Sequence, residues 1–312
     1  MIGVAEIEAA RQRTAGAVRR TPMLRLGPAR QRPGGAAELL LKLESLQVTG
    51  SFKVRGAMNM VLTTPADERR RGLITASGGN HGLGVAYAGH TTGTPTTVYL
   101  PRSTPPAKAE KLRGWGATVL YEGEVWDDAN RAALQAAERT GALYVHPFAD
   151  PRVLAGQGTL GLEIIEEAPE LEVLLVAIGG GGLISGVALA AHARNPRLRI
   201  IGVEPVGAPT LYESVKAGRV IELPGVHTAA GTLAPRKSAQ LNLDIIREHV
   251  AEIVLIEDEQ MRAAARWLYA ECGVATELSG AAAVAALLSE RVQVAPTTRV
   301  CAIVCGAGSD GF

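Results

Sequence analysis

Short apolar runs alternate along the chain with longer segments in which apolar and polar positions recur at helical spacing. The short runs are rich in Val, Ile and Leu, which is typical of strands buried on both faces. We expect strands at residues 38–42, 73–76, 96–100, 118–121, 143–145, 173–178, 200–203, 252–256 and 299–304. We expect helices at residues 53–62, 81–88, 108–115, 128–139, 158–167, 183–193, 208–217, 259–271 and 280–288.

This alternation predicts an α/β fold with two lobes, built from mostly parallel twisted sheets that helices cover on both faces. A length of 312 residues favours two packed units. Two polar, turn-rich stretches, residues 64–71 and 146–151, are placed to carry the chain from one unit to the other and back. We therefore expect a large domain of residues 1–65 and 150–312, with a small domain of residues 66–149 inserted into it.

Composition narrows the class of protein. Hydrophobic residues make up 47% of the chain, and 32 basic residues nearly balance 31 acidic ones, so nothing points to a nucleic-acid or membrane partner. Residues 173–191 carry no charge, but four central glycines favour a strand, a turn and a helix over a membrane span. The start of the chain lacks the apolar run of a secretion signal. Three cysteines make no disulfide framework, so we expect a cytoplasmic protein.

The four consecutive glycines are the first candidate site. Gly179, Gly180, Gly181 and Gly182 follow a predicted strand and precede a predicted helix. Glycines allow a sharp bend with bare N–H groups, and the helix N-terminus adds partial positive charge. The segment therefore predicts a phosphate site, with a tight turn that binds no ligand as the alternative.

A dinucleotide site is a rival interpretation of this bend. The spacing G-x-G-x-x-G does not occur there, and its match at residues 306–311 leaves no room for a following helix before Phe312. Glu204 does end the next predicted strand, where a ribose-binding acid is expected. A nicotinamide oxidoreductase therefore stays open as an alternative.

Lys53 is the second candidate. It falls in the first turn of a predicted helix, after Ser51 as a candidate N-cap, where its charge opposes the helix dipole. Its neighbours Phe52 and Val54 are apolar, so the amine is either a snorkelling side chain or a nucleophile whose pKa is lowered by burial. An aldehyde cofactor bearing a phosphate would connect this amine to the glycine bend.

Two more strand ends carry polar groups. The strand at 73–76 leads into a nest of N–H groups suited to a carboxylate or a ring oxygen, although a capped helix start explains it equally well. Cys305 ends the last strand, where open α/β sheets place ligands, and inert packing is the alternative. The nest that follows the strand at 73–76 consists of Ser77, Gly78, Gly79, Asn80 and His81.

These segments, in this order, resemble the serine/threonine dehydratase group of the fold-type II pyridoxal-phosphate enzymes. The similarity also takes in residues 20–24, 42–57, 203–205 and 277–281, and so spans nearly the whole chain. The resemblance implies the following roles: Lys53 binds pyridoxal 5'-phosphate, Gly179, Gly180, Gly181, Gly182 and Leu183 hold its phosphate, Phe52 lies near its ring, Asn80 bonds its ring hydroxyl, Cys305 replaces the usual serine facing its pyridine nitrogen, and Ser77, Gly78, Gly79, Asn80 and His81 receive the substrate carboxylate.

The resemblance implies β-elimination of threonine, serine or a related 3-hydroxy amino acid to a 2-oxo acid and ammonia, by a homodimer. Lys53 would remove the α-proton. A neutral thiol at Cys305 would weaken the electron withdrawal by the ring, which favours prompt loss of the leaving group. Alternatives within the fold are a β-replacement enzyme, an amino-acid racemase and a non-catalytic ligand-binding protein. Gly78 stands where racemases of this group carry a serine, which argues against racemisation.

A metal site is not predicted. Glu204 matches a divalent-cation ligand of some members and is a weak candidate, but Thr210 stands where a second carboxylate is expected. Ala230 likewise replaces a frequent aspartate, and hard cations favour several oxygen ligands. The sequence ends at Phe312, so we expect none of the regulatory domain that feedback-controlled members carry.

Overall fold

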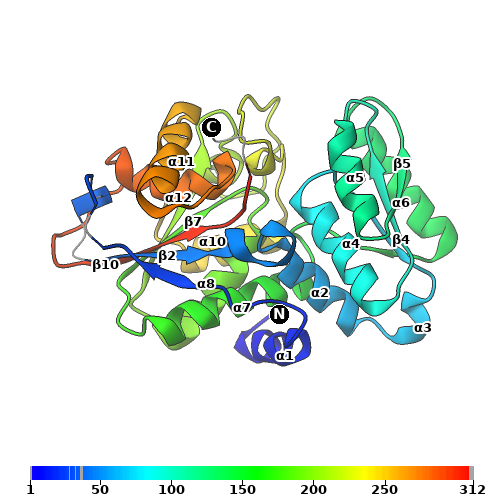
Figure 1. Cartoon of the computed structure of the whole chain (residues 1–312), viewed down its shortest axis with the longest axis horizontal. Helices are drawn as coiled ribbons and strands as arrows, with labels where there is room; N and C mark the ends of the chain where they lie inside the picture. The colour runs from blue at the N-terminus through cyan, green and yellow to red at the C-terminus, as the bar shows by residue number, and fades with distance from the viewer. Residues whose placement is uncertain (1, 28, 32, 36–37, 309–312) are drawn as a thin grey trace.

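The computed structural model describes residues 2–27, 29–31, 33–35 and 38–308 and contains two sheets, one in each lobe of Figure 1. The larger sheet has the strand order β1-β2-β10-β7-β8-β9, and every pair in it is parallel except the antiparallel β1 and β2. Its strands are β1 (Met23–Arg25), β2 (Glu38–Leu43), β7 (Val173–Ala177), β8 (Arg199–Pro205), β9 (Glu252–Ile256) and β10 (Arg299–Val304).

The smaller sheet has the order β5-β4-β3-β6 and is parallel throughout. Its strands are β3 (Leu73–Ala76), β4 (Thr96–Leu100), β5 (Thr118–Tyr121) and β6 (Leu143–Tyr144). The predicted α/β class with two mostly parallel sheets is therefore confirmed. The domain boundaries at 65/66 and 149/150 stay a prediction, and all four strands of this sheet fall between them.

Helices cover the sheets and connect the lobes (Figure 1). All nine predicted helices are present, whereas α1, α3, α10 and the short edge strand β1 were not predicted. Among the described residues, no helix has both the length and the apolar character that crossing a membrane requires. The helices are α1 (Val4–Thr14), α2 (Lys53–Thr63), α3 (Ala66–Arg69), α4 (Asn80–Thr92), α5 (Pro106–Gly114), α6 (Trp126–Thr140), α7 (Pro151–Glu167), α8 (Gly182–Arg194), α9 (Thr210–Ala217), α10 (Gln240–His249), α11 (Asp258–Cys272) and α12 (Leu278–Leu288).

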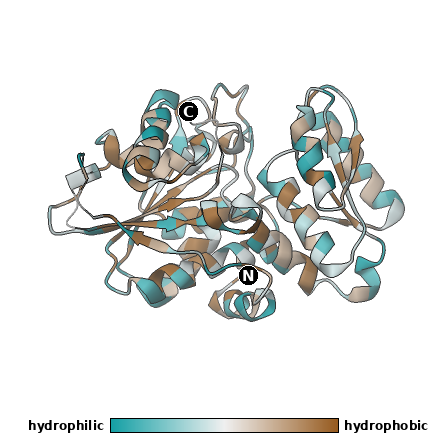
Figure 2. Ribbon diagram, viewed as in Figure 1, coloured by the Kyte–Doolittle hydropathy of each residue, from teal (hydrophilic) through white to brown (hydrophobic). Residues whose placement is uncertain are grey.

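The uncharged stretch 173–191 forms a buried strand, a bend and a buried helix, as predicted. Figure 2 shows the strands of the larger sheet as an apolar layer between helices. Helices α7 and α8 pack closely because glycines face the neighbouring backbone. A Cβ atom on Gly186 would lie 2.3 Å from the carbonyl oxygen of Leu154. This close packing fixes α8, and with it the bend at its N-terminus.

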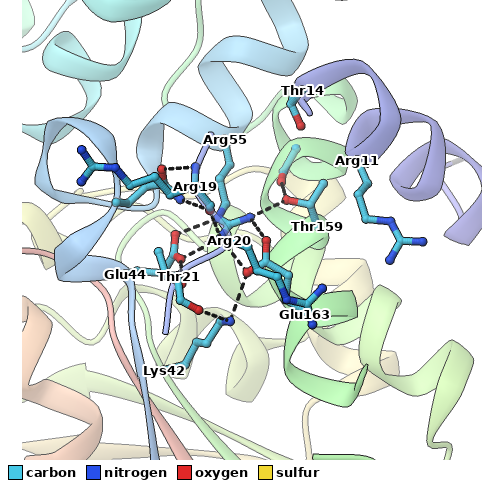
Figure 3. Close-up of polar contacts among 12 residues, drawn as sticks. Arg11, Thr14, Arg19, Arg20, Thr21, Lys42, Glu44, Arg55, Thr159 and Glu163 are labelled. Carbon is cyan, nitrogen blue, oxygen red and sulfur yellow. Dashed lines mark hydrogen bonds and ion pairs between the residues drawn. The ribbon is translucent and has the colours of Figure 1, made fainter. Parts of the chain in front are cut away.

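A buried network of charged side chains holds α2 against α7 and the end of β2 (Figure 3). The fully buried Arg55 guanidinium donates to both oxygens of Glu44, at 2.7 and 2.8 Å, and to both oxygens of Glu163, at 2.7 and 3.0 Å. Burial works against this charge, but the two carboxylates outweigh it and raise the pKa of Arg55. The buried Lys42 amine lies 3.1 Å from Glu163 and joins the same network. Since Arg55 is two residues from Lys53, the network anchors the first turn of α2.

Candidate active site

Lys53 is the first residue of α2, and its side chain is half-buried. Nζ donates to the carbonyl oxygen of Pro147 at 2.9 Å and lies 5.2 Å from the centre of the Phe52 ring. Burial lowers the pKa of Lys53 to about 8, although Cys305 and Glu277 act in the opposite direction. An amine with this pKa is partly neutral near pH 7, which is the form that attacks carbonyls.

The start of α2 differs from the prediction in one detail. Phe52, and not Ser51, is the N-cap residue, and it makes no side-chain cap. The Ser51 hydroxyl is buried and has no hydrogen-bond partner among the described residues. The first turn of α2 is held instead by the interactions of Arg55.

The four glycines form a bend that only glycine fits. A Cβ on Gly180 would lie 2.2 Å from the Phe148 ring, and one on Gly182 would lie 2.9 Å from the Cα of Phe148. Gly181, the N-cap of α8, has a φ of +89°, a conformation that favours glycine. The bend therefore needs glycine for both space and backbone conformation.

The chemistry of this bend suits a phosphate. The N–H groups in the first turn of α8 have no acceptor within the helix, and the helix dipole adds positive character. Ser238 and Asn242 donate to the carbonyl oxygen of Gly180, at 2.9 and 2.6 Å. Because a trans peptide points its C=O and N–H in opposite directions, these bonds turn the N–H of Gly181 away from Ser238 and Asn242. The residues that the resemblance assigns to the phosphate, Gly179 to Leu183, thus provide amide donors at a helix N-terminus.

One segment connects Lys53 to the bend. Pro147 accepts the hydrogen bond of Lys53, and the next residue, Phe148, packs against Gly180 and Gly182. Asn242 links Phe148 to the glycine bend, because it donates to the carbonyl oxygens of Phe148 and Gly180. The amine and the candidate phosphate cradle therefore belong to one site.

The nest that precedes α4 lies at the C-terminal end of β3. Gly79 is the N-cap, Asn80 is the first helical residue, and the Ser77 hydroxyl accepts from the N–H of Gly79 at 3.3 Å. His81 is buried with Nε2 2.9 Å from the carbonyl oxygen of Val145. Burial, with a smaller contribution from Lys53, lowers the pKa of His81 to about 3. The imidazole is therefore neutral, so the nest attracts a carboxylate through its backbone amides and not through a charge on His81.

Gly78 lies in a confined part of this nest. A Cβ at this position would lie 3.1 Å from the Cγ2 atom of Thr104 and 3.3 Å from the Cδ2 atom of Leu100. A larger residue would have to displace these side chains slightly. The position provides no hydroxyl that could carry a proton.

Cys305 follows β10 and is buried. Its Sγ lies 3.4 Å from the carbonyl oxygen of Ser279, and burial raises its pKa above the ordinary thiol range. Cys305 is therefore a neutral thiol at pH 7. The charge of Glu277 also raises the pKa of Cys305 and that of Lys53 lowers it, so both groups lie close to the thiol.

Glu277 belongs to the site and was given no role from the sequence. Its Oε1 accepts hydrogen bonds from Asn80 Nδ2 at 2.7 Å and from the Ser279 hydroxyl at 2.7 Å. The Thr232 hydroxyl lies 3.5 Å from the same oxygen. In the sequence, Glu277 lies in one of the segments that resemble the family and just before a predicted helix, but the second position is equally typical of a cap and neither assigns it a role.

Both carboxylate oxygens of Glu204 accept hydrogen bonds from the protein itself. Its two carboxylate oxygens accept from the N–H groups of Leu211 and Tyr212, at 2.9 and 2.8 Å, so it caps α9. Burial raises the pKa of Glu204 to about 8, against the effect of these two bonds. Among the described residues, no three His, Cys, Asp or Glu side chains gather closely enough to hold a metal ion. These contacts give no support to Glu204 as a metal ligand or as a ribose-binding acid.

Comparison with known proteins agrees with this geometry. The family model described as "Pyridoxal-phosphate dependent enzyme" matches residues 14–306. The chain is 41% identical to L-threonine ammonia-lyase of Thermotoga maritima and 44% identical to that of Geobacter sulfurreducens, over 93% and 85% of its length. It spans 72% and 66% of those two proteins. The solved structure of maize serine racemase is 33% identical, superposes with a TM-score of 0.91, and is matched over 98% of this chain and 93% of its own.

Proposed function

The chain belongs to the pyridoxal-phosphate-dependent enzymes, and we propose that it converts threonine, serine or a related 3-hydroxy amino acid into a 2-oxo acid and ammonia. The observation that carries this proposal is the amine of Lys53, which has a lowered pKa and is tied through Pro147 and Phe148 to the glycine bend. The similarity of the chain to two L-threonine ammonia-lyases supports the same reaction class.

The residues present fit the cofactor. We assign the phosphate to Gly179, Gly180, Gly181, Gly182 and Leu183, the aldehyde to Lys53, the ring hydroxyl to Asn80, the ring face to Phe52 and the pyridine nitrogen to Cys305. The neutral Cys305 thiol leaves that nitrogen without an opposing carboxylate. When bound, the cofactor supplies an electron sink that acidifies the α-carbon of an amino acid.

The chain's own groups bind the substrate and move its protons. The amides of the nest formed by Ser77, Gly78, Gly79, Asn80 and His81 are placed to hold the α-carboxylate. Neutral Lys53 is the base that takes the α-proton, and its pKa of about 8 keeps part of it neutral near pH 7. Loss of the 3-hydroxyl group and addition of water then account for the 2-oxo acid and ammonia.

Racemisation is the competing activity, because the chain is also similar to a serine racemase. A two-base racemase needs a proton donor on the face opposite Lys53. Gly78 provides no hydroxyl at the position that the resemblance assigns to that donor, and this favours elimination over racemisation. β-Replacement remains the alternative within the elimination chemistry, since both begin with loss of the same group.

Turnover assays test the proposal. We expect 2-oxo acid and ammonia in equal amounts from L-threonine or L-serine, and no product from the Lys53→Ala variant. The Lys216→Ala variant is the control, because this lysine is largely exposed and pairs only with Glu213 and the Tyr212 ring among the described residues. Full activity of Lys53→Ala, or product only when a second nucleophile is added, would refute elimination as the function.

We propose in addition that the enzyme is a cytoplasmic homodimer, as its family resemblance implies. The three cysteines are free thiols, which fits a reducing compartment. Light scattering of the purified protein should give twice the chain mass of 32.6 kDa, whereas a monomer at working concentration would contradict the dimer.

A further inference from the structure

Residues 146–149, between β6 and α7, form a turn organised by an imidazole. His146 Nδ1 accepts hydrogen bonds from the backbone N–H groups of Phe148, at 3.2 Å, and Ala149, at 2.9 Å. The ring also packs edge-on against the Phe148 ring, with 4.8 Å between centroids. One side chain thus holds both Phe148 and Ala149 in this turn.

Both bonds require an unprotonated Nδ1, so the ring proton is on Nε2 and the imidazole is neutral. If Nδ1 were protonated, its N–H would point at the backbone N–H groups of Phe148 and Ala149, and both hydrogen bonds would be lost. Burial first, and then the charge of Lys53, lower the pKa of His146 to about 4, although Asp150 acts in the opposite direction. His146 is therefore a permanent acceptor at neutral pH.

The turn contacts both Lys53 and the glycine bend. The carbonyl oxygen of Pro147 receives the Lys53 amine at 2.9 Å. The Phe148 ring occupies the space beside Gly180, and the Phe148 carbonyl oxygen accepts from Asn242 at 3.0 Å. Since Pro147 and Phe148 are consecutive residues, a change in the turn moves both groups together.

We propose that His146 is a positioning residue for Lys53, acting as the acceptor that fixes the turn between the reactive amine and the glycine bend. This inference rests on the proposed function for its catalytic meaning, but its physical content concerns the protein without cofactor. Removing the acceptor leaves two backbone N–H groups unpaired, which favours a relaxed turn that admits water. Lys53 is then more exposed to water, which stabilises its ammonium form and outweighs the loss of the Pro147 acceptor.

Two variants separate the acceptor from the bulk of the ring. In His146→Asn the carboxamide oxygen takes nearly the place of Nδ1, so the two hydrogen bonds persist. In His146→Leu the volume is roughly kept and the acceptor is lost. Thermal unfolding of both identifies any variant that fails to fold.

The measured quantity is the pKa of Lys53 in the protein freed of cofactor, from the pH dependence of its labelling by an amine reagent. Peptide mass spectrometry reports the label on this lysine alone. We expect His146→Leu to raise the pKa by about one unit toward the ordinary lysine value, which lowers labelling near pH 7 about tenfold. His146→Asn should stay close to the wild type.

Unchanged labelling in a folded His146→Leu protein overturns the proposal. So does a folded His146→Asn protein that behaves like the leucine variant, because the acceptor would then not be what matters. Neither result depends on turnover, so a protein that lacked lyase activity would still give a clear answer on His146.

Discussion

The side-chain amide of Asn80, at the start of α4, donates to the carboxylate of Glu277 at 2.7 Å, although 197 residues separate them in the sequence. The contact joins the smaller lobe to the N-terminus of α12. It holds the amide that we assign to the cofactor ring hydroxyl, and it places a negative charge close enough to Lys53 to raise the pKa of that amine.

Replacing Glu277 by Gln tests this relationship. The variant keeps the size of the side chain but loses the charge and weakens the charge-assisted bond to Asn80. We expect the pKa of Lys53 to fall below about 8 and kcat/KM to fall about tenfold, the cost of one hydrogen bond to a charged group. Glu213→Gln, at a half-exposed carboxylate on α9 that pairs with Lys216, is the control. A Glu277→Gln enzyme with wild-type kinetics and labelling would show that the contact is only structural.

The pH dependence of stability should reflect the two neutral histidines. The pKa values of His81 and His146 are lowered to about 3 and about 4, so below pH 6.5 the unfolded chain takes up protons that the folded chain excludes. Each histidine therefore contributes a loss of stability as the pH falls from 6.5 toward its folded pKa, at up to about 1.4 kcal/mol per pH unit.

Denaturant unfolding at several pH values isolates one of these contributions. Between pH 6.5 and pH 4, His146→Asn should lose stability less steeply than the wild type, by up to about 1.4 kcal/mol per pH unit, because it cannot take up this proton when unfolded. Parallel curves for the two proteins would mean that His146 is not held neutral in the folded state.

Gly180→Ala should weaken cofactor binding. The added Cβ would lie 2.2 Å from the Phe148 ring, so the ring or the bend must move. We expect the Kd for pyridoxal phosphate, measured by fluorescence titration, to rise about tenfold or more, since a small overpacking costs about 1–3 kcal/mol. Combining it with Phe148→Leu should recover part of the affinity. Gly114→Ala, where a Cβ meets nothing within 4 Å, should bind normally. Tight binding by Gly180→Ala would contradict the role of the bend.

Gly78→Ser tests why elimination is favoured over racemisation. Its Cβ would lie 3.1 Å from the Cγ2 atom of Thr104, so Thr104→Ser, which removes that atom, is added to make room. We expect the double variant to form D-serine from L-serine, detected by chiral chromatography, at a rate at least tenfold above that of the wild type and of Thr104→Ser alone. A wild-type enzyme that formed D-serine as fast as 2-oxo acid would show that Gly78 does not decide between the reactions.

Much of the fold could be predicted from the sequence because most strands are apolar runs bounded by turns. The edge strand β1 (Met23–Arg25) escaped prediction because three residues carry no periodicity. Helix α10 (Gln240–His249) escaped it because Leu241, Leu243 and Ile245 alternate with polar residues as in a strand, and its N-cap Ala239 gives no capping signal. The network of Lys42, Glu44, Arg55 and Glu163 is equally invisible, because its charges are compensated only through contacts made in the folded chain.

Some residues of the candidate site could likewise be predicted from the sequence, and others could not. Lys53 and the glycine bend could be identified because each breaks a local rule, a charge opposing a helix dipole and more glycines than a turn needs. His146 and Glu277 obey local rules, and they join the site only through partners far away in the sequence. Such residues cannot be found from spacing alone.

Covalent mapping of the cofactor tests the central claim most directly. The wild-type protein is incubated with pyridoxal phosphate, reduced with borohydride, digested and analysed by mass spectrometry. We predict loss of a visible absorption band on reduction and a pyridoxyl phosphate label on Lys53. A label on another lysine, or no visible band with the cofactor, would contradict the account.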